Sequence, residues 1–489
     1  MERRRTNHAV TFGVLATAAT AFGLLQCLII PAIPQLEHVL RTSEAAASWL
    51  LTGYLISAAI CTPVLGRIGD LVGKKRIIVS VLVALSIGSL ISALATALPL
   101  MLVGRVIQGA GGALFPLAFG IIRDEFPVER VAGAIGIISA ILGAGAGAGI
   151  ILAGPILVHL NYHWLFWIPL FISATATIAA VVFVPESRVR AVGRINWLGA
   201  VLMSSWLVTG LLAISYAPTW GWGNSSIIGL TAATVILLVL WIIAEIRSAS
   251  PLVDMKMMRI PAVWATNLSA LLFGFGMFAI FVTLPQFTET PSGVGYGFGA
   301  SVTRSGLYLL PFAVAMVIVA PMTGRLSVVV GSKVVLVTGS LFAASSYLVL
   351  VLSHSEQWSM YAATGLLGIG IAFGFASMAN LIIEAVPAEQ TGVATGMNTN
   401  IRNIGGALGS GIATSLVIST MLRDGYPKES GYVLAFAISG AALVVAALAA
   451  MMIPTRAAPS VISGETHLAL RAEAEVIVGA IALSSEDLV

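Results

Sequence analysis

Long apolar segments alternate with short polar or Pro/Gly-rich breaks along almost the whole chain. Each segment approaches the roughly 20 apolar residues that an α-helix needs to cross the hydrocarbon core of a bilayer. We count fourteen such segments, at residues 11–33, 48–65, 77–97, 99–122, 131–157, 164–184, 196–215, 226–245, 262–285, 302–323, 334–352, 359–383, 392–420 and 431–453. The pattern predicts an all-α integral membrane protein with fourteen transmembrane helices.

The first apolar segment has two interpretations. Arg3 to Arg5 precede it, and the Ala-x-Ala patterns near Ala19 are typical of a cleaved signal peptide. The apolar stretch continues to Ile33, however, which is longer than the apolar region of such a peptide. We therefore expect an uncleaved first helix.

Composition excludes several classes of protein. Hydrophobic residues make up 58% of the 489 residues and charged residues only 9%, whereas soluble chains have about 25% charged residues. The net charge of +4 is too small and too scattered for a nucleic-acid-binding surface. Cys27 and Cys61 both lie in apolar segments, and His159 and His163 have no carboxylate nearby. We expect no disulfide framework, no metal site and no other cofactor.

Basic residues predict the orientation in the membrane, because Lys and Arg are retained on the cytoplasmic side. With both termini inside, nineteen of the 25 Lys and Arg residues fall in cytoplasmic segments, four fall outside, and Arg105 and Arg402 lie within helices. Tryptophans also fall at predicted outer boundaries, as an interfacial aromatic belt requires: Trp49, Trp164, Trp220, Trp222 and Trp358. The sequence predicts a multi-pass protein of the plasma (inner) membrane with both termini cytoplasmic.

An internal repeat appears when residues about 260 apart are compared. The segment 66–74 resembles 324–333, and 126–130 resembles 386–390; Asp124 then corresponds to Glu384. The repeat predicts two six-helix bundles, residues 1–190 and 261–455, with a two-helix insert at 191–260 and a cytoplasmic tail at 456–489. Repeats of this kind place a substrate site between the halves near the bilayer midplane.

Two motifs of the first half carry a family resemblance. Residues 66–76 read Gly-Arg-Ile-Gly-Asp-Leu-Val-Gly-Lys-Lys-Arg, and 105–109 read Arg-Val-Ile-Gln-Gly. They are similar to the loop signature and the fourth-helix signature of the major facilitator superfamily, and the chain resembles its drug/proton antiporter family with fourteen spanning segments. The resemblance implies a secondary transporter that exports drugs or metabolites by alternating access, with protons as the coupling partner.

The chain departs from that family at two places. The family's first helix usually carries an Asp, whereas the corresponding residues here are Leu25-Gln26-Cys27-Leu28. In the fifth-helix signature, Ala148 stands where a Pro is usual. Proton coupling through the family's usual carboxylate is therefore not expected.

The loop signature predicts a gate at the cytoplasmic side. Glycines let helix ends approach, and Asp70 can accept from a helix N-terminus or pair with a cation. The resemblance implies a charge relay from Asp70 to the acid at the end of the fourth helix, Asp124 or Glu125. The alternative is a basic turn that only fixes the topology. The predicted gating residues are Gly66, Asp70, Gly73, Lys74, Arg76, Asp124, Glu125 and Arg130.

Two buried arginines predict the substrate cavity. Inserting an Arg into a membrane costs at least ~2.5 kcal/mol, so it normally faces a cavity or a partner. Arg105 shares a helix face with Gln108, and Arg402 shares one with Asn398. Weaker candidates for the cavity are Gln26, Tyr54, Asn267 and Asn380. The alternatives are an Arg bonded to backbone carbonyls and amides that simply join helices.

Glycines at regular spacing predict close helix packing, because small residues let transmembrane backbones approach. They are Gly143, Gly145, Gly147 and Gly149 on the fifth helix, and Gly405 and Gly409 on the thirteenth.

The function classes can now be compared. An enzyme would need a cluster of acids or histidines with a substrate-binding loop, a sensor would need an output domain, and a primary pump would need a phosphate loop; the sequence supports none of these. We expect a monomeric secondary transporter of small molecules. Because no acid lies near the midplane, we expect neutral or anionic amphipathic substrates. The alternative is an exporter or uptake carrier for an endogenous neutral or anionic metabolite or lipid.

Overall fold

The computed structural model describes residues 8–29, 32–42, 44–187, 194–419, 422 and 426–454. The predicted tail at 456–489, the N-terminal arginines and the predicted boundary at residue 190 lie outside these residues.

The first half of the chain forms six long helical segments. They are α1 (His8–Cys27), α3 (Glu44–Val72), α4 (Lys74–Leu94), the broken segment α5–η2–α6 (Leu98–Gln108, Gly109–Ala113 and Leu114–Glu125), α7 (Val128–His159) and α8 (Trp164–Phe183). The short α2 (Ile33–Val39) lies between the first two. The glycines at 109, 111 and 112 lack side chains to support an α-helical turn, and the chain tightens there into the 3₁₀ turn η2.

The insert and the second half form eight more long segments. These are α9 (Trp197–Trp220), α10 (Ser225–Arg247), α12 (Pro261–Glu289), the pair α13 (Val302–Leu307) and α14 (Leu310–Val330), α15 (Ser332–Ser353), α16 (Gln357–Ala385), α17 (Thr391–Ile418) and α18 (Glu429–Met451). Three shorter elements, α11 (Met255–Met258), η3 (Ser292–Val294) and η4 (Ala388–Gln390), lie in the connections. The short helices α2 and α11 were not expected, because they are too short to leave an apolar periodicity. The predicted segment 302–323 is broken into α13 and α14.

Twelve helices among the described residues are long and apolar enough to cross a membrane, or up to thirteen if the bent pair 303–319 and 321–330 is one span. The predicted count of fourteen is therefore close but not confirmed. The remaining predicted segment coincides with the 28-residue helix α17, which is not among these spans. Its polar residues Thr395, Asn398, Asn400 and Arg402 lower its hydropathy.

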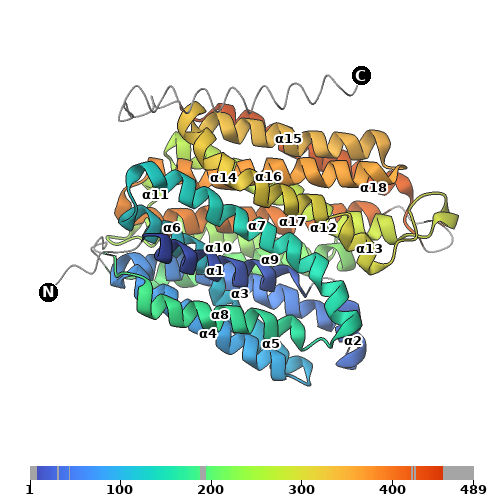
Figure 1. Cartoon of the computed structure of the whole chain (residues 1–489), viewed down its shortest axis with the longest axis horizontal. Coiled ribbons are helices and arrows are strands. Elements are labelled where there is room, and N and C mark those ends of the chain that lie inside the picture. Colours follow the sequence, from blue (N-terminus) through green and yellow to red (C-terminus); the bar gives the residue numbers. More distant parts are fainter. Residues whose placement is uncertain are drawn as a thin grey trace.

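Helices from before and after the insert lie on opposite sides of the molecule (Figure 1). In Figure 1, α15 and α18 lie along one side of the molecule, α4, α5 and α8 along the other, and α7, α12 and α17 between them. The halves meet where α3 crosses α17 and α7 crosses α14, and further contacts join α7 to α16 and α6 to α17. The insert helix α9 packs on both α3 and α17, so it covers the outside of the first crossing.

The crossings themselves repeat. A Cβ atom on Gly66 of α3 would lie 2.9 Å from the carbonyl oxygen of Gly392 on α17, and one on Gly324 of α14 would collide with Gly133 on α7. The turns that follow also match, since Gly73 and Gly331 precede α4 and α15 with φ of +127° and +90°. Only glycine adopts such angles readily, so these two turns need it. The crossing and the turn that follows it are therefore alike in the two halves.

Candidate functional site between the two halves

A cavity lies where the two halves face each other. It encloses about 570 Å³ of empty space, including its mouth. Its walls come from α1, α3, η2, α6 and α7 of the first half and from α12, α16 and α17 of the second. The lining is mostly aromatic or apolar and includes Phe22, Phe115, Met277, Phe278, Phe281 and Phe375. A mostly apolar lining with a few polar groups is typical of a small-molecule site.

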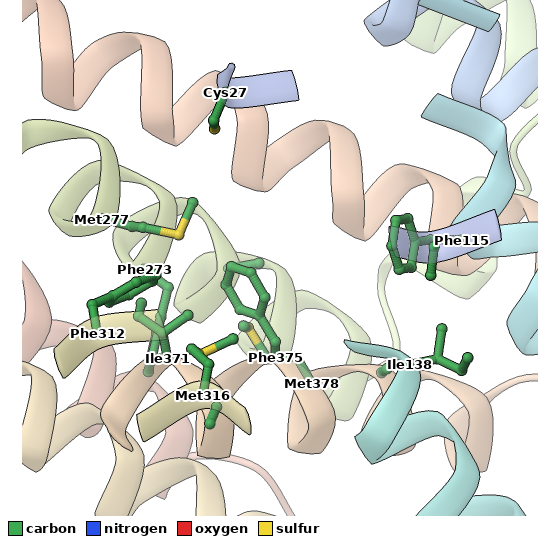
Figure 2. Close-up of a cluster of buried hydrophobic side chains, with 14 of the residues drawn as sticks. Cys27, Phe115, Ile138, Phe273, Met277, Phe312, Met316, Ile371, Phe375 and Met378 are labelled. Carbon is green, nitrogen blue, oxygen red and sulfur yellow. The ribbon is translucent and has the colours of Figure 1, made fainter. Parts of the chain in front are cut away.

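Figure 2 shows how the apolar wall is assembled. Met277 and Phe375 lie beside Phe273 and Phe312, which are completely buried, while Phe115 lies further along, beyond Phe375. Because these side chains come from helices of both halves, a rigid-body movement of one half would change the shape of the cavity.

The polar groups of this cavity are few. Gln26, Tyr54, Thr399, Arg402 and Asn403 contribute to its wall. A second space of about 310 Å³ adjoins it and shares Phe115, Phe375, Thr399 and Arg402. Among the described residues, no carboxylate lines either space.

Arg402 is the cation that both spaces share. Its side chain is only 8% exposed, and its guanidinium lies 4.2 Å from the ring centre of Phe375. Its guanidinium makes no hydrogen bond or ion pair with another described residue. Nine residues separate Arg402 from Val393 at the start of α17, a distance of ~14 Å along the helix and thus near mid-depth. Arg402 can therefore donate to an anionic or polar group in the cavity.

Arg105 is placed differently. It is fully buried and lines neither space. Its Nε donates to the Leu50 carbonyl at 2.9 Å, and Nη1 donates to Gln108 Oε1 at 2.9 Å and to the Leu25 carbonyl at 3.4 Å. The guanidinium also lies 4.3 Å from the Tyr54 ring centre. Arg105 is thus an arginine bonded to backbone carbonyls, which was the alternative to a cavity residue. It packs against the Tyr54 ring, which lines the cavity.

Gln108 continues this buried network and also lines neither space. Its Nε2 donates to Ser89 Oγ on α4 at 3.0 Å. The network joins α1, α3, α4 and α5 inside the first half. It fixes the wall that carries Gln26 and Tyr54.

The predicted asparagines are also divided. Asn398 lines the second space and donates to Asn267 Oδ1 on α12 at 2.9 Å. Asn267 and Asn380 are buried outside both spaces. Asn400, which the sequence analysis did not select, donates from α17 to the Ala59 carbonyl of α3 at 2.6 Å and so joins the two halves.

Three of the predicted gating residues form a buried ion cluster where α3 and α6 end and α4 begins. We call it the Asp70 cluster, and it consists of Asp70, Lys74, Asp124 and the additional residue Ser187. Lys74 Nζ lies 2.7 Å from Asp124 Oδ2 and 3.6 Å from Asp70 Oδ1. Ser187 also donates to Asp124. Of the two acids at the end of α6, Asp124 is thus the one that pairs with Lys74.

Asp70 reaches the other half of the molecule. The Val393 amide, in the first turn of α17, donates to Asp70 Oδ2 at 3.2 Å. A carboxylate at a helix N-terminus is favourable because that end carries a partial positive charge. Gly392 allows this approach, since a Cβ atom there would lie 2.8 Å from both carboxylate oxygens. Asp70 therefore joins the halves at this end.

The other predicted gating residues lie at the edge of the cluster. Glu186 lies beside Gly73 and forms an ion pair with Arg76, whose exposed side chain places Nε 3.5 Å from Glu186 Oε2. Arg130 is exposed in the first turn of α7, and Glu125 is the last residue of α6.

The second half carries a weaker copy of this cluster. Ser332 and Glu384 take the places of Lys74 and Asp124, and Ser332 Oγ lies 3.4 Å from Glu384 Oε1. Val328 stands where Asp70 would be. The position on α14 that is equivalent to Asp70 therefore carries no charge.

Arg123, the residue before Asp124, was not among the predicted site residues. It lies in the last turn of α6 and contacts the connection between α16 and α17 of the other half. Its position at a helix end looked like one of many basic residues that set topology, so the sequence contained no specific signal for it.

The predicted glycines lie at three interfaces. On α7, Gly143 and Gly147 face Met316, Phe312 and Ala313 of α14, whereas Gly145 and Gly149 face Gly23 and Leu24 of α1. On α17, Gly405 and Gly409 lie against the backbone of α12 at Leu271 and Phe275. The α7 glycines thus form two ridges, one toward each half.

The part of the chain that the structure describes holds no group of three metal-ligating residues.

Comparison with known proteins identifies the family and similar folds. The model of the Major Facilitator Superfamily matches residues 12–410 and again 266–482. The tetracenomycin C resistance and export protein of Streptomyces glaucescens is 29% identical over 427 residues, which are 86% of this chain and 77% of that protein. The multidrug transporter protein MdtP of Bacillus subtilis is 28% identical over 74% of this chain, which spans only 66% of MdtP. The crystal structure of the human organic anion transporter MFSD10 superimposes with a TM-score of 0.63 over 92% of this chain and 100% of the other at 14% identity.

Proposed function

The chain belongs to the major facilitator superfamily, and we propose that it is a secondary exporter that carries amphipathic small molecules across the plasma membrane by alternating access. Membership confirms the predicted resemblance and the expectation of a multi-pass membrane transporter, not an enzyme. The relative named as a tetracenomycin C resistance and export protein supports the direction of transport, and the relative named as a multidrug transporter supports a small-molecule substrate.

One observation carries this proposal: an aromatic cavity that both halves line, beside a charged contact that joins the halves at one end. A substrate in the cavity touches both halves, so its binding is coupled to their relative position. The Asp70 contact has to break for that end to open. In the proposed orientation, with both termini cytoplasmic, this end is the cytoplasmic side.

The charge of the cavity supports a substrate class. Arg402 has no carboxylate beside it in the described cavity wall, so a permanent cation would be repelled there. A neutral or anionic amphipathic compound would place its apolar part among the phenylalanines and its polar group at Arg402. Without a carboxylate in the wall, proton coupling would run through the Asp70 cluster or through the substrate's own ionisation.

Asp70→Asn tests the gate. This variant keeps the side-chain size but removes the charge at the α17 N-terminus and one of the two carboxylate partners of Lys74. We expect the turnover of purified, reconstituted protein to fall by at least about tenfold while substrate affinity changes less than twofold, as for a gating step. Asp124→Asn should give a milder loss. A transport rate of Asp70→Asn equal to that of the parent would refute the gate.

A further inference from the structure

Arg123 reaches from α6 of the first half to the turn between α16 and α17 of the second. Its Nη2 donates to the Val386 carbonyl at 2.9 Å, Nη1 donates to the Pro387 carbonyl at 3.4 Å, and Nη1 also donates to Thr391 Oγ1. Val386 is the C-cap residue of α16, and Thr391 is the first residue of α17. All these bonds cross between the halves.

The charge of Arg123 fits the helix end that it contacts. The last carbonyls of a helix lack partners and carry a partial negative charge, which a cation stabilises. Asp70 meets the opposite end of the next helix, where the Gly392 and Val393 amides carry a partial positive charge. One half thus presents a cation to the C-terminus of α16 and an anion to the N-terminus of α17, which are joined by a short turn.

We propose that Arg123 and Asp70 form a two-charge clasp on the α16–α17 turn, and that Arg123 is a positioning residue that holds the halves together on the Asp70 side. The proposal deepens the proposed alternating-access function and rests on it. Each charge acts on its own helix end. Lys74 serves the clasp indirectly, because it lies between Asp70 and Asp124 and neutralises their mutual repulsion.

This arrangement makes a distinctive prediction about charge reversal. In a simple ion pair, exchanging the two charges restores the interaction. In the clasp, Asp70→Arg combined with Arg123→Asp would place each charge against a helix end of the same sign. The exchange should therefore be worse than either single neutral substitution.

The test uses the full chain with Cys27 and Cys61 replaced and with spin labels at two exposed positions, Val72→Cys at the end of α3 and Val330→Cys at the end of α14. Distances between the labels report opening on the Asp70 side without any substrate. We expect Arg123→Gln to raise the ratio of open to closed molecules by about tenfold, as loss of charge-assisted bonds predicts. Arg123→Lys, which keeps the charge but loses the forked geometry, should give a smaller increase.

Arg247→Gln is the matched control, because Arg247 is also an arginine in the last turn of a spanning helix but is exposed. It should leave the label distances unchanged. Unchanged distances in Arg123→Gln, or a return to the parental distances in the charge exchange, would overturn the clasp. If the label distances change as expected in Arg123→Gln but the parent protein transports no tested compound, the proposed function is contradicted and the clasp is supported.

Discussion

Arg105 and Arg402 look alike in the sequence, as single arginines inside apolar segments, but their surroundings differ. Arg105 donates to two backbone carbonyls and to Gln108 inside the first half. The Arg402 guanidinium lies over the Phe375 ring, and Arg402 lines both cavity spaces. The sequence predicted that both arginines were buried. It could not assign their roles, because the carbonyls that surround Arg105 come from α1 and α3, which are remote in sequence.

Arg402→Gln tests the role of Arg402 in substrate choice. We expect the apparent affinity for an anionic amphipathic compound to fall by about tenfold, because a charge-assisted hydrogen bond is lost. The affinity for its neutral amide should change less than threefold. Competition binding to purified protein measures both values. Arg259→Gln, at an exposed arginine, is the control for the loss of one positive charge. Equal losses for both compounds would contradict the assignment.

At the scale of elements, most helices could be predicted from hydrophobic runs, and the exceptions have physical causes. The run at 99–122 contains the 3₁₀ turn η2, which the glycines at 109, 111 and 112 impose. The helix α17 is less apolar than the other long helices because its polar residues face the cavity and α3 rather than lipid. The contact of Arg123 with the end of α16 depends on how the halves pack, and no local sequence pattern predicts that packing.

Two glycine substitutions test the packing of elements. A Cβ atom on Gly405 would collide with the backbone carbonyl of Leu271 on α12, which cannot move aside. A Cβ atom on Gly143 would meet only the end of the flexible Met316 side chain. Gly405→Ala should therefore destabilise the purified protein by about 1–3 kcal/mol, the usual cost of overpacking, and Gly143→Ala by much less. Thermal unfolding in detergent measures both, and similar midpoints for the two variants would be inconsistent with this packing.

At the scale of the whole molecule, several contacts occur in both halves at positions that the sequence repeat relates. The pairs Gly66–Gly392 and Gly324–Gly133 occupy equivalent crossings, and Lys74–Asp124 and Ser332–Glu384 occupy equivalent corners. The position of the insert was not predictable, because the apolar faces of α9 and α10 do not show which helices of the two halves they pack against. The structure places α9 beside α3 and α17.

Orientation in the membrane is a prediction at this scale. In a variant that lacks Cys27 and Cys61, a cysteine in place of Lys75 should react with an impermeant thiol reagent only after the membrane is opened. A cysteine in place of Gly223, in the loop after α9, should react in intact cells. Labelling of the Lys75 position from outside would reverse the topology and place the Asp70 cluster on the outer side.

Transport into inverted membrane vesicles tests the central claim most directly. The parent protein should accumulate an anionic or neutral amphipathic dye, an uncoupler should abolish the accumulation, and Arg402→Gln should reduce it for the anionic dye. A permanent cation such as a quaternary ammonium dye should not accumulate above the level of vesicles without the protein. Robust, proton-driven accumulation of that cation, undiminished in Arg402→Gln, would contradict the account of an electropositive cavity.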